Sequence, residues 1–400
     1  MDERKRKVSL RIWILIIVPT TVFITFIFLC YYLIKRKPKK SNKSLLRENF
    51  GKESLTLEPL QFNLATLKAA TNNFSEQNRI GKGGFGEVYK GILLDGQHVA
   101  VKMLSKNSTQ GAKEFKNEVS VIAKLQHRNL VTFIGFCLEE QTKILIYEYV
   151  SNKSLDYFLF DSQLSKLLSW TERYNIIKGI ARGIFYLHEL SRLKVIHRDL
   201  KPSNVLLDEN MIPKISDFGL AKIVEINQDQ VNTNKIVGTF GYMPPEYAMF
   251  GQFSEKLDVF SFGVMVLEII TGKKNLSSHK PHVPEGLLSY VWRQWRDQTW
   301  LDILDPNIKE NYSEFEVTKC IQIGLLCVQQ NPDVRPTMTD VLSYFSSYFN
   351  ELPSSQEPAF FLNERSNPTI FPQESNINQP INNCIPFSTN KMSVSEFLPR

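Results

Sequence analysis

Two short stretches of the chain bring acidic, basic and amide side chains together at a spacing that suits phosphoryl transfer. They read Ile196-His197-Arg198-Asp199-Leu200-Lys201-Pro202-Ser203-Asn204 and Asp217-Phe218-Gly219. Asp199 would accept the proton of a substrate hydroxyl, and Lys201 would neutralise the phosphoryl group in transit. Asn204 and Asp217 offer the oxygen ligands that Mg²⁺ prefers. We therefore predict that these four residues carry a magnesium-dependent transfer from ATP.

A glycine-rich turn lies upstream and reads Gly81-Lys82-Gly83-Gly84-Phe85-Gly86-Glu87-Val88. Glycines let backbone amides approach phosphate oxygens without a Cβ in the way. Alone, the pattern could also indicate a dinucleotide site, which needs a strand, then the loop, then a helix. Here the loop leads into another strand near residues 88–90. We therefore favour a hairpin that covers ATP.

The run Val99-Ala100-Val101-Lys102 places a lysine in an apolar strand, where its charge needs an anionic partner. A surface lysine on an edge strand is the alternative. We expect Lys102 to hold the α- and β-phosphates and to pair with a glutamate of the next helix. Glu114 and Glu118 are the candidates. Glu118 is preferred because it lies on the side of the buried apolar stripe around Val119.

Residues 220–242 are interpreted as an activation loop, and they contain Thr233 and Thr239. Thr233 is the favoured phosphosite, since Arg198 could pair with a phosphate on this loop. A solvated loop threonine is the alternative. Thr239 is the second candidate, although we expect it to contact the substrate site and residues 197–204, which we interpret as the catalytic loop. Farther along, Glu246 and Arg335 are expected to form a structural ion pair.

Residues 12–34 are almost uninterruptedly apolar, contain no charged side chain and are long enough to span a bilayer. A cleaved signal peptide is the alternative, but Lys35-Arg36-Lys37 follows in place of a small-residue cleavage site. We predict a short segment over 1–11 and a single transmembrane helix over 12–34, anchored in the plasma membrane. Basic residues flank both ends and lean only slightly toward a cytosolic C-terminal side. The need for cytosolic ATP decides the orientation.

Composition excludes several other classes of protein. The net charge is +7, and much of the excess lies in residues 4–7 and 35–43. A nucleic-acid binder would instead spread basic residues over a face with interleaved aromatics, so we expect no nucleic acid as partner. The second basic cluster could also contact lipid headgroups. The five cysteines show neither zinc-ligand spacing nor a disulfide framework, which favours reduced thiols in the cytosol.

The rest of the chain divides by composition. Residues 35–73 are a polar juxtamembrane segment, and 74–350 begin with strand-like runs around one helix near 112–125. Helical patterns follow at 174–189, 258–271, 287–297, 316–329 and 337–349. Residues 351–400 are rich in Pro, Ser, Asn and Gln and are predicted to be a disordered tail.

Together these motifs resemble those of plant receptor-like protein kinases, and most closely the cysteine-rich receptor-like kinases. The resemblance covers roughly residues 60–350. The matching stretches are Phe62-Asn63-Leu64 through Asn72-Asn73-Phe74, 80–88, Asn117-Glu118-Val119 through His127-Arg128-Asn129-Leu130-Val131, Tyr147-Glu148-Tyr149-Val150, 213–219, Tyr247-Ala248-Met249 through Gly263, and 323–329 through 335–338.

The resemblance implies an α+β, two-lobed protein kinase fold, with a small β-rich lobe that carries one key helix and a larger, mostly helical lobe. ATP and Mg²⁺ would lie in the cleft. Tyr147 would be the gatekeeper, and Glu148 to Val150 the hinge beside adenine. Lys201-Pro202 resembles the serine/threonine pattern. The implied ATP contacts are Ile80, Gly81, Lys82, Gly83, Gly84, Phe85, Gly86, Val88, Ala100, Lys102, Tyr147, Glu148, Val150, Asn204 and Asp217.

Related receptors carry a large cysteine-rich extracellular domain, and here about eleven residues precede the apolar span. We therefore expect a kinase that lacks this domain, phosphorylates protein substrates including its own activation loop, and partners other receptor-like kinases. A scaffold that signals by binding is the alternative, but Lys102, Asp199 and Asp217 are all retained. Leu257 stands where a serine or threonine is usual in these relatives. This difference could perturb the loop that supports Asp199.

Overall fold

The computed structural model describes residues 18–32, 42–83, 86–104, 109–139, 142–224, 231–275, 286–308, 312–346 and 352–360. The chain divides into two compact units, Met1–Ser54 and Leu55–Arg400. In the first unit residues 18–32 are helical, and α2 (Asn42–Phe50) and η1 (Gly51–Glu53) follow. Among the described residues, no helix combines the length and apolar character needed to cross a bilayer. Residues 12–17 and 33–34 of the predicted span lie outside them.

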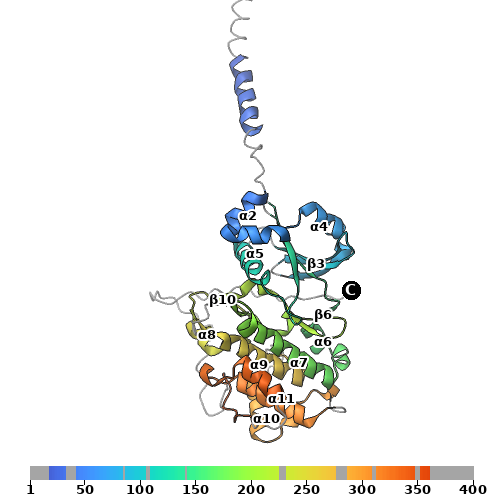
Figure 1. The fold of residues 1–400 in the computed structure, drawn as a ribbon, viewed down its shortest axis with the longest axis vertical. Helices are drawn as coiled ribbons and strands as arrows, with labels where there is room; N and C mark the ends of the chain where they lie inside the picture. The colour runs from blue at the N-terminus through green and yellow to red at the C-terminus, as the bar shows by residue number, and fades with distance from the viewer. Residues whose placement is uncertain are drawn as a thin grey trace, which may run out of the picture. The chain divides into compact units, whose positions relative to one another are not determined.

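The second unit contains a five-stranded antiparallel sheet in the order β1-β2-β3-β5-β4. Its strand β3 is labelled in Figure 1. The helix α5 comes between β3 and β4, as the apolar pattern predicts. The β1–β2 hairpin is the one that the glycine pattern predicts, although Gly84 and Phe85 lie outside the described residues. The elements of this lobe are β1 (Arg79–Gly83), β2 (Gly86–Ile92), β3 (His98–Leu104), α5 (Thr109–Ile122), β4 (Phe133–Glu139) and β5 (Thr142–Glu148).

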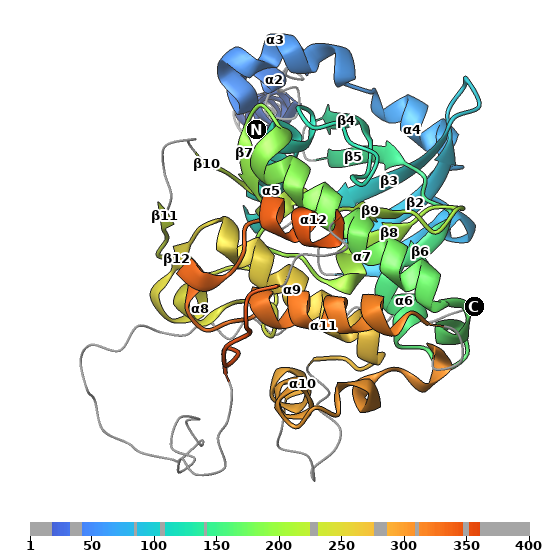
Figure 2. The same cartoon turned by 60° about the horizontal axis from the view of Figure 1, so that its bottom comes forward.

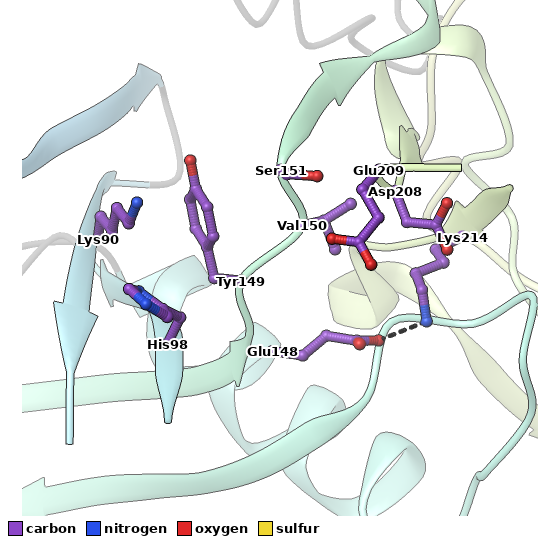
Figure 3. Close-up of a pocket in the computed structure, with 9 residues that line it drawn as sticks. All are labelled: Lys90, His98, Glu148, Tyr149, Val150, Ser151, Asp208, Glu209 and Lys214. Atoms are coloured by element: carbon purple, nitrogen blue, oxygen red, sulfur yellow. Dashed lines mark hydrogen bonds and ion pairs between the residues drawn. The ribbon is translucent and has the colours of Figure 1, made fainter. Parts of the chain in front are cut away.

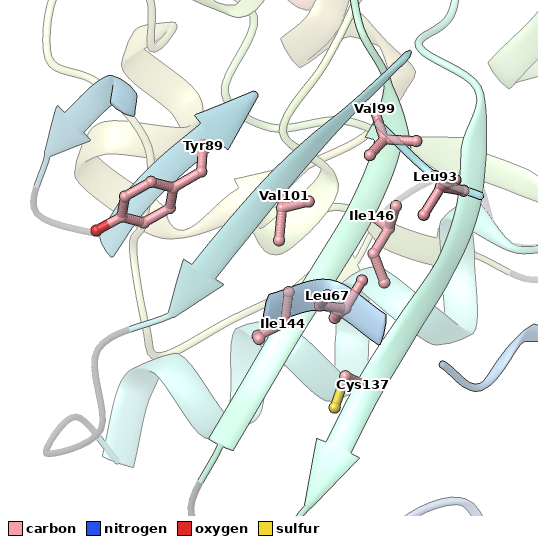
Figure 4. Close-up of a cluster of buried hydrophobic side chains, with 8 residues drawn as sticks. All are labelled: Leu67, Tyr89, Leu93, Val99, Val101, Cys137, Ile144 and Ile146. Atoms are coloured by element: carbon pink, nitrogen blue, oxygen red, sulfur yellow. The ribbon is translucent and has the colours of Figure 1, made fainter. Parts of the chain in front are cut away.

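The side chains of β3 alternate between the hydrophobic core on one face of the sheet and the candidate site on the other. Successive residues of a strand point to opposite faces of the sheet. Val99 and Val101 are fully buried in a cluster with Leu67 of α4 (Leu64–Ala70) (Figure 4). Lys102 therefore points to the opposite face, where α5 packs. The cluster comprises Leu67, Tyr89, Leu93, Val99, Val101, Cys137, Ile144 and Ile146.

Part of the predicted juxtamembrane segment packs on this lobe. The Phe62 amide donates to the Phe136 carbonyl at 2.8 Å, and the Leu64 amide donates to Glu139 Oε1 at 2.9 Å. Leu67 is fully buried. The segment thus covers β4, which is the edge strand of the sheet and would otherwise offer its backbone to other chains.

We expect Gly135→Ala to destabilise the chain through this contact. A Cβ at Gly135 would lie 2.3 Å from the Leu60 carbonyl oxygen and 2.6 Å from the Phe62 ring. Overpacking of this kind costs about 1–3 kcal/mol. Thermal melting of the purified chain measures the loss. Gly286→Ala is the matched control, since a Cβ there meets nothing within 4 Å. Equal melting temperatures for the two variants would contradict the contact.

The second lobe is mostly helical (Figures 1 and 2). Its central helix α9 (Glu255–Thr271) is buried from Leu257 to Thr271 and packs against α7, α10 and α11. A helix that is apolar on all sides belongs in a core. Cys320 and Cys327 of α11 are buried free thiols, as expected. The other helices are α6 (Leu155–Leu159), α7 (Trp170–Phe185), α8 (Pro245–Phe250), α10 (Leu287–Arg296), α11 (Glu314–Cys327) and α12 (Met338–Ser346).

Short elements between these helices carry the loops of interest. Small sheets form between β6, β8 and β9, between β7 and β10, and between β11 and β12. Their bounds are β6 (Asn152–Ser154), β7 (Lys194–Ile196), β8 (Val205–Leu207), β9 (Pro213–Ile215), β10 (Lys222–Val224), β11 (Val231–Asn232) and β12 (Gln252–Phe253). The 3₁₀ helix η7 (Phe218–Leu220) follows Asp217 directly.

Residues 352–360 fall within the segment predicted to be a disordered tail, yet they pack on the end of α11. The Ala359 amide donates to the Val328 carbonyl at 2.9 Å, and Ala359 is fully buried. Gln322 Nε2 donates to the Pro353 carbonyl at 3.0 Å. The average composition of the tail hides this short anchored piece, which differs from the prediction. Residues 361–400 lie outside the described part of the chain.

Candidate active site

Lys102 joins two acidic side chains from different elements. Its Nζ lies 2.8 Å from Asp217 Oδ1 and 3.3 Å from Glu118 Oε2. The predicted choice of Glu118 as its partner is therefore confirmed. Burial alone would lower the pKa of Lys102, but the charges of Asp217 and Glu118 outweigh it and raise that pKa. The lysine is thus held as a cation between β3, α5 and the segment before η7.

The two carboxylates around Lys102 differ in their surroundings. Burial raises the pKa of Glu118 against the attraction of Lys102. Burial opposes ionisation of Asp217 as well, but the charge and hydrogen bond of Lys102 outweigh it and lower the pKa of Asp217. The hydroxyl of Tyr147 donates to Glu118 Oε1, a contact that the sequence did not indicate. The predicted gatekeeper is thus tied to α5.

Asp217 has an unusual backbone. Its φ of 65° and ψ of 72° lie in the left-handed region, which costs a non-glycine residue about 1–3 kcal/mol. The next residue, Phe218, is fully buried, and its ring centroid lies 4.9 Å from that of His197. The surroundings therefore hold a strained residue in place, and its carboxylate contacts Lys102.

The residues predicted to act on the substrate form one hydrogen-bonded network. Asp199 Oδ2 accepts from Asn204 Nδ2 at 3.1 Å and lies 3.0 Å from Lys201 Nζ. Asp199 Oδ1 accepts from the Thr239 hydroxyl at 2.6 Å. Lys201 Nζ donates to the same hydroxyl at 2.8 Å. The expected contact of Thr239 with the catalytic loop is therefore confirmed, and Asp199 already accepts an aliphatic hydroxyl.

The predicted catalytic loop, residues 197–204, is held by Asp258 of α9. Asp258 is fully buried and accepts from the amides of His197 at 2.7 Å and Arg198 at 3.0 Å. His188 Nε2 lies 3.0 Å from the same carboxylate. Leu257, the residue expected to perturb this loop, is a core residue. It packs in a cluster with Ile196, Val224, Tyr247 and Phe253. Its apolar side chain does not prevent Asp258 from reaching both amides.

Among the described residues, no group of three or more His, Cys, Asp or Glu side chains is placed to hold a metal ion. The predicted Mg²⁺ ligands are a partial set, the carboxylate of Asp217 and the amide oxygen of Asn204. Asn204 Nδ2 is engaged by Asp199, which leaves Oδ1 as the ligand atom. This set fits Mg²⁺, which proteins usually bind through one or two carboxylates together with substrate phosphates.

The other predicted ATP contacts lie on the hairpin, on β3 and after β5. Lys82 Nζ pairs with Glu87 Oε1 at 3.1 Å within the hairpin. The register places Val88 opposite Lys102 and Ala100 opposite Tyr147. Of the other predicted ATP contacts, Ile80, Gly81 and Gly83 lie in β1, Gly86 begins β2, and Val150 lies two residues after the end of β5.

A cavity of about 450 Å³ opens beside residues 148–150, the predicted hinge (Figure 3). Glu148 lines it, and its carboxylate accepts from Lys214 Nζ at 2.9 Å and from the Thr132 amide at 2.7 Å. These bonds outweigh burial and lower the pKa of Glu148. The side chain of this predicted ATP residue is therefore committed to other partners. The cavity is lined by Lys90, His98, Glu148, Tyr149, Val150, Ser151, Asp208, Glu209 and Lys214, so it is separate from Lys102 and Asp217.

The predicted activation loop, residues 220–242, is anchored at Thr233. Its residues 225–230 lie outside the described part of the chain. The Thr233 amide donates to the Gly251 carbonyl at 3.0 Å, beside the β11–β12 pair. Arg198 donates to the Tyr247 hydroxyl at 2.7 Å, and its buried Nε has no hydrogen-bond partner among the described residues. Its contact with a phosphate stays a prediction. The predicted ion pair of Glu246 with Arg335 is confirmed at 2.6 Å.

Sequence reasoning missed a buried carboxyl that holds the loop around Thr239. Both oxygens of Glu268 accept from the Tyr242 hydroxyl at 3.0 Å. The Asn275 amide donates to Glu268 Oε1 at 2.8 Å, and Asn275 Nδ2 donates to the Gly241 carbonyl at 2.7 Å. Burial raises the pKa of Glu268 to about 8. Its only signal in the sequence was a glutamate within the largely apolar run 259–271.

The raised pKa of Glu268 makes stability depend on pH. The folded chain keeps this proton up to about pH 8, whereas the unfolded chain releases it near 4.5. Its stabilising contribution is present below pH 4.5 and is lost as pH rises through 8, with a slope of up to about 1.4 kcal/mol per pH unit. The melting temperature, measured at pH 6, 7 and 8, should therefore fall more steeply with pH for the wild type than for Glu268→Gln. The same decrease with pH in both proteins would contradict the prediction.

Comparison with known proteins agrees with this geometry. Residues 74–346 match the model of the protein kinase domain. Cysteine-rich receptor-like protein kinase 8 of Arabidopsis thaliana is 48% identical to this chain over 386 residues. Cysteine-rich receptor-like protein kinases 25 and 5 of the same plant are 52% identical over 335 residues and 56% identical over 313 residues, respectively. The alignments cover 96%, 84% and 78% of this chain and 56%, 49% and 47% of those relatives. The chain thus spans about half the length of the curated relatives it matches. It belongs to the protein kinase family.

Proposed function

We propose that this chain is a membrane-anchored serine/threonine protein kinase, which transfers the γ-phosphoryl group of ATP to protein hydroxyls, including those of its own activation loop. The observation that carries the proposal is the meeting of Lys102 with Glu118 and Asp217, beside an Asp199 that accepts a hydroxyl. Together these groups supply a cation for phosphates, a carboxylate for Mg²⁺ and an acceptor for the substrate proton.

The chain's own residues have separate tasks in this proposal. Lys102 orients the phosphates, and Glu118 holds Lys102 in place. Asp199 orients the attacking hydroxyl and accepts its proton, while Lys201 neutralises charge on the moving group. Mg²⁺, when bound with ATP through Asn204 and Asp217, supplies further neutralisation of phosphate charge.

The hydroxyl specificity is inferred from Thr239. Its hydroxyl lies between Lys201 and Asp199 at 2.8 Å and 2.6 Å, so the site already accommodates an aliphatic hydroxyl. A serine or threonine of a substrate would offer the same group to Asp199. The pattern Lys201-Pro202 supports the same specificity.

The test is autophosphorylation of the purified full chain with ATP and Mg²⁺, beside Asp199→Asn, with phosphosites read by mass spectrometry. We expect phosphate on Thr233 in the wild type alone. Thr239 is the weaker candidate, because its hydroxyl is engaged by Lys201 and Asp199. Binding of ATP without transfer in either protein would overturn the proposal and favour a scaffold.

Membrane anchoring is inferred from the uncharged apolar run over residues 12–34. Residues 18–32 are helical and expose large apolar side chains such as Phe23, Phe26 and Phe28, which suits a lipid environment. Carbonate extraction of cell membranes tests this, and we expect the chain to stay in the pellet. An arginine at Phe26 costs about 2.5–3.5 kcal/mol at the centre of a span, so Phe26→Arg should release part of it. Extraction of the wild type would contradict anchoring.

Partnership with other receptor-like kinases is a further part of the proposal, based on the similarity to proteins named as receptor-like kinases. We expect such kinases to co-purify with the detergent-solubilised chain. Asp199→Asn should retain this association, because it changes only the proposed catalytic carboxylate.

A further inference from the structure

A carboxamide on α5 reaches the turn that follows Asp217. Asn117 Nδ2 donates to the carbonyl oxygens of Ala221 at 2.6 Å and Gly219 at 3.0 Å, and that of Phe218 lies 3.4 Å away. All three acceptors belong to η7 or to the residue after it. Three carbonyl oxygens around one nitrogen form a site for a hydrogen-bond donor, and a carboxylate there would be repelled.

The place of Asn117 in the chain gives this contact its meaning. Asn117 immediately precedes Glu118, and Phe218 immediately follows Asp217. One carboxamide therefore links the two segments whose acidic side chains meet at Lys102. The link does not involve Lys102 itself, so it sets the spacing of α5 and η7 independently of the ion pairs.

The backbone of Asp217 explains why such a link is needed. Asp217 is held in the left-handed region, and its own side chain is occupied by Lys102. A strained residue persists only when its surroundings fix it. Asn117 holds the segment directly after Asp217 by its hydrogen bonds to the carbonyls of that turn.

We propose that Asn117 is a positioning residue for phosphoryl transfer, which clamps residues 218–221 to α5 and so keeps Glu118 and Asp217 within reach of Lys102. The inference rests on the proposed function. It assigns Asn117 no contact with substrate or nucleotide. A role in general stability alone is the alternative, and it predicts different results in the experiments below.

The first experiment compares Asn117→Ala with the wild type, using the full chain purified in detergent. We expect kcat for a peptide substrate to fall about tenfold, which corresponds to about 1.4 kcal/mol, with the peptide KM within about twofold. Hydrogen–deuterium exchange should become faster in peptides that cover residues 217–222 and stay unchanged in α7 and α9. Lys116→Ala, at an exposed position of the same helix, is the control and should behave as the wild type. Unchanged kcat, or faster exchange throughout the chain, would overturn the proposal.

The second experiment uses Asn117→Asp, which keeps the shape but removes both donor hydrogens. A carboxylate that faces three carbonyl oxygens has a raised pKa, and only its protonated form can donate. The ratio of its kcat to that of the wild type should therefore rise as pH falls from about 8 to 6. A ratio that does not change with pH would overturn the clamp. If the wild type transfers no phosphate, the proposed function fails, and the exchange comparison still decides whether Asn117 holds the turn.

Discussion

Replacing Asp217 by asparagine should lower kcat for peptide phosphorylation by at least about 10²–10³, the range found when one preorganised electrostatic contact is removed from a transition state. The substitution keeps the size of the side chain but removes the negative charge that Lys102 contacts at 2.8 Å. It also removes the only carboxylate of the proposed Mg²⁺ ligands. Steady-state kinetics with the purified chain measures the effect, and circular dichroism checks that the fold persists.

Lys102→Met should cause a loss of similar size, for a different reason. It leaves the buried Glu118 and the partly buried Asp217 without their shared cation, so we expect Glu118 to take up a proton. Lys68→Met is the matched control, because Lys68 is an exposed lysine on α4. Retention of kcat within about threefold in either Asp217→Asn or Lys102→Met would contradict the role assigned to the cluster, since removal of a central charge must be felt.

The residues that carry the proposed chemistry could be predicted because each lies in a short motif. Asp199, Lys201 and Asn204 are neighbours in the chain, and local spacing is what a sequence shows directly. The pairing of Lys102 with Glu118 also followed from local patterns, since the two lie on consecutive elements. The partners in these contacts could therefore be inferred from the charges of the side chains and from the periodicity of the strand and helix.

The supporting residues could not be predicted, because their partners are distant in the chain. Asn117 donates to Ala221 across 104 positions, and Arg173 contacts Asp305 across 132. A half-buried asparagine on an amphipathic helix looks in sequence like any solvated polar residue. Only the packing of α5 on η7 gives Asn117 its acceptors. Similarly, the charge of Glu148 suggested nothing of the Lys214 partner that the fold brings from β9.

The same long-range packing leads to the largest expected effect on stability, at Arg173 of α7. Arg173 is fully buried, and its guanidinium donates to Asp305 Oδ2 at 2.7 Å and to the Ile269 carbonyl at 2.7 Å. Its Nε donates to the Leu168 carbonyl at 3.0 Å. Burial lowers the pKa of Arg173 against the attraction of Asp305, but an arginine keeps its charge over the physiological range. One side chain thus satisfies groups from several elements of the helical lobe.

We expect Arg173→Met to reduce the free energy of unfolding by about 3–5 kcal/mol, because Asp305 is left as an unpaired buried charge and the carbonyls lose their donor. Chemical denaturation of the purified chain measures the loss. Arg182→Met is the control, since Arg182 is exposed on the same helix and should change stability by less than about 0.5 kcal/mol. Removing the partner charge as well, in Arg173→Met/Asp305→Leu, should recover part of the loss, because apolar replacements of both ions avoid the desolvated charge. The account would be contradicted if the double variant lost more free energy of unfolding than the two single variants lose in sum. Each single variant leaves one buried ion without its partner, and the double variant removes both ions, so its loss should be smaller than that sum.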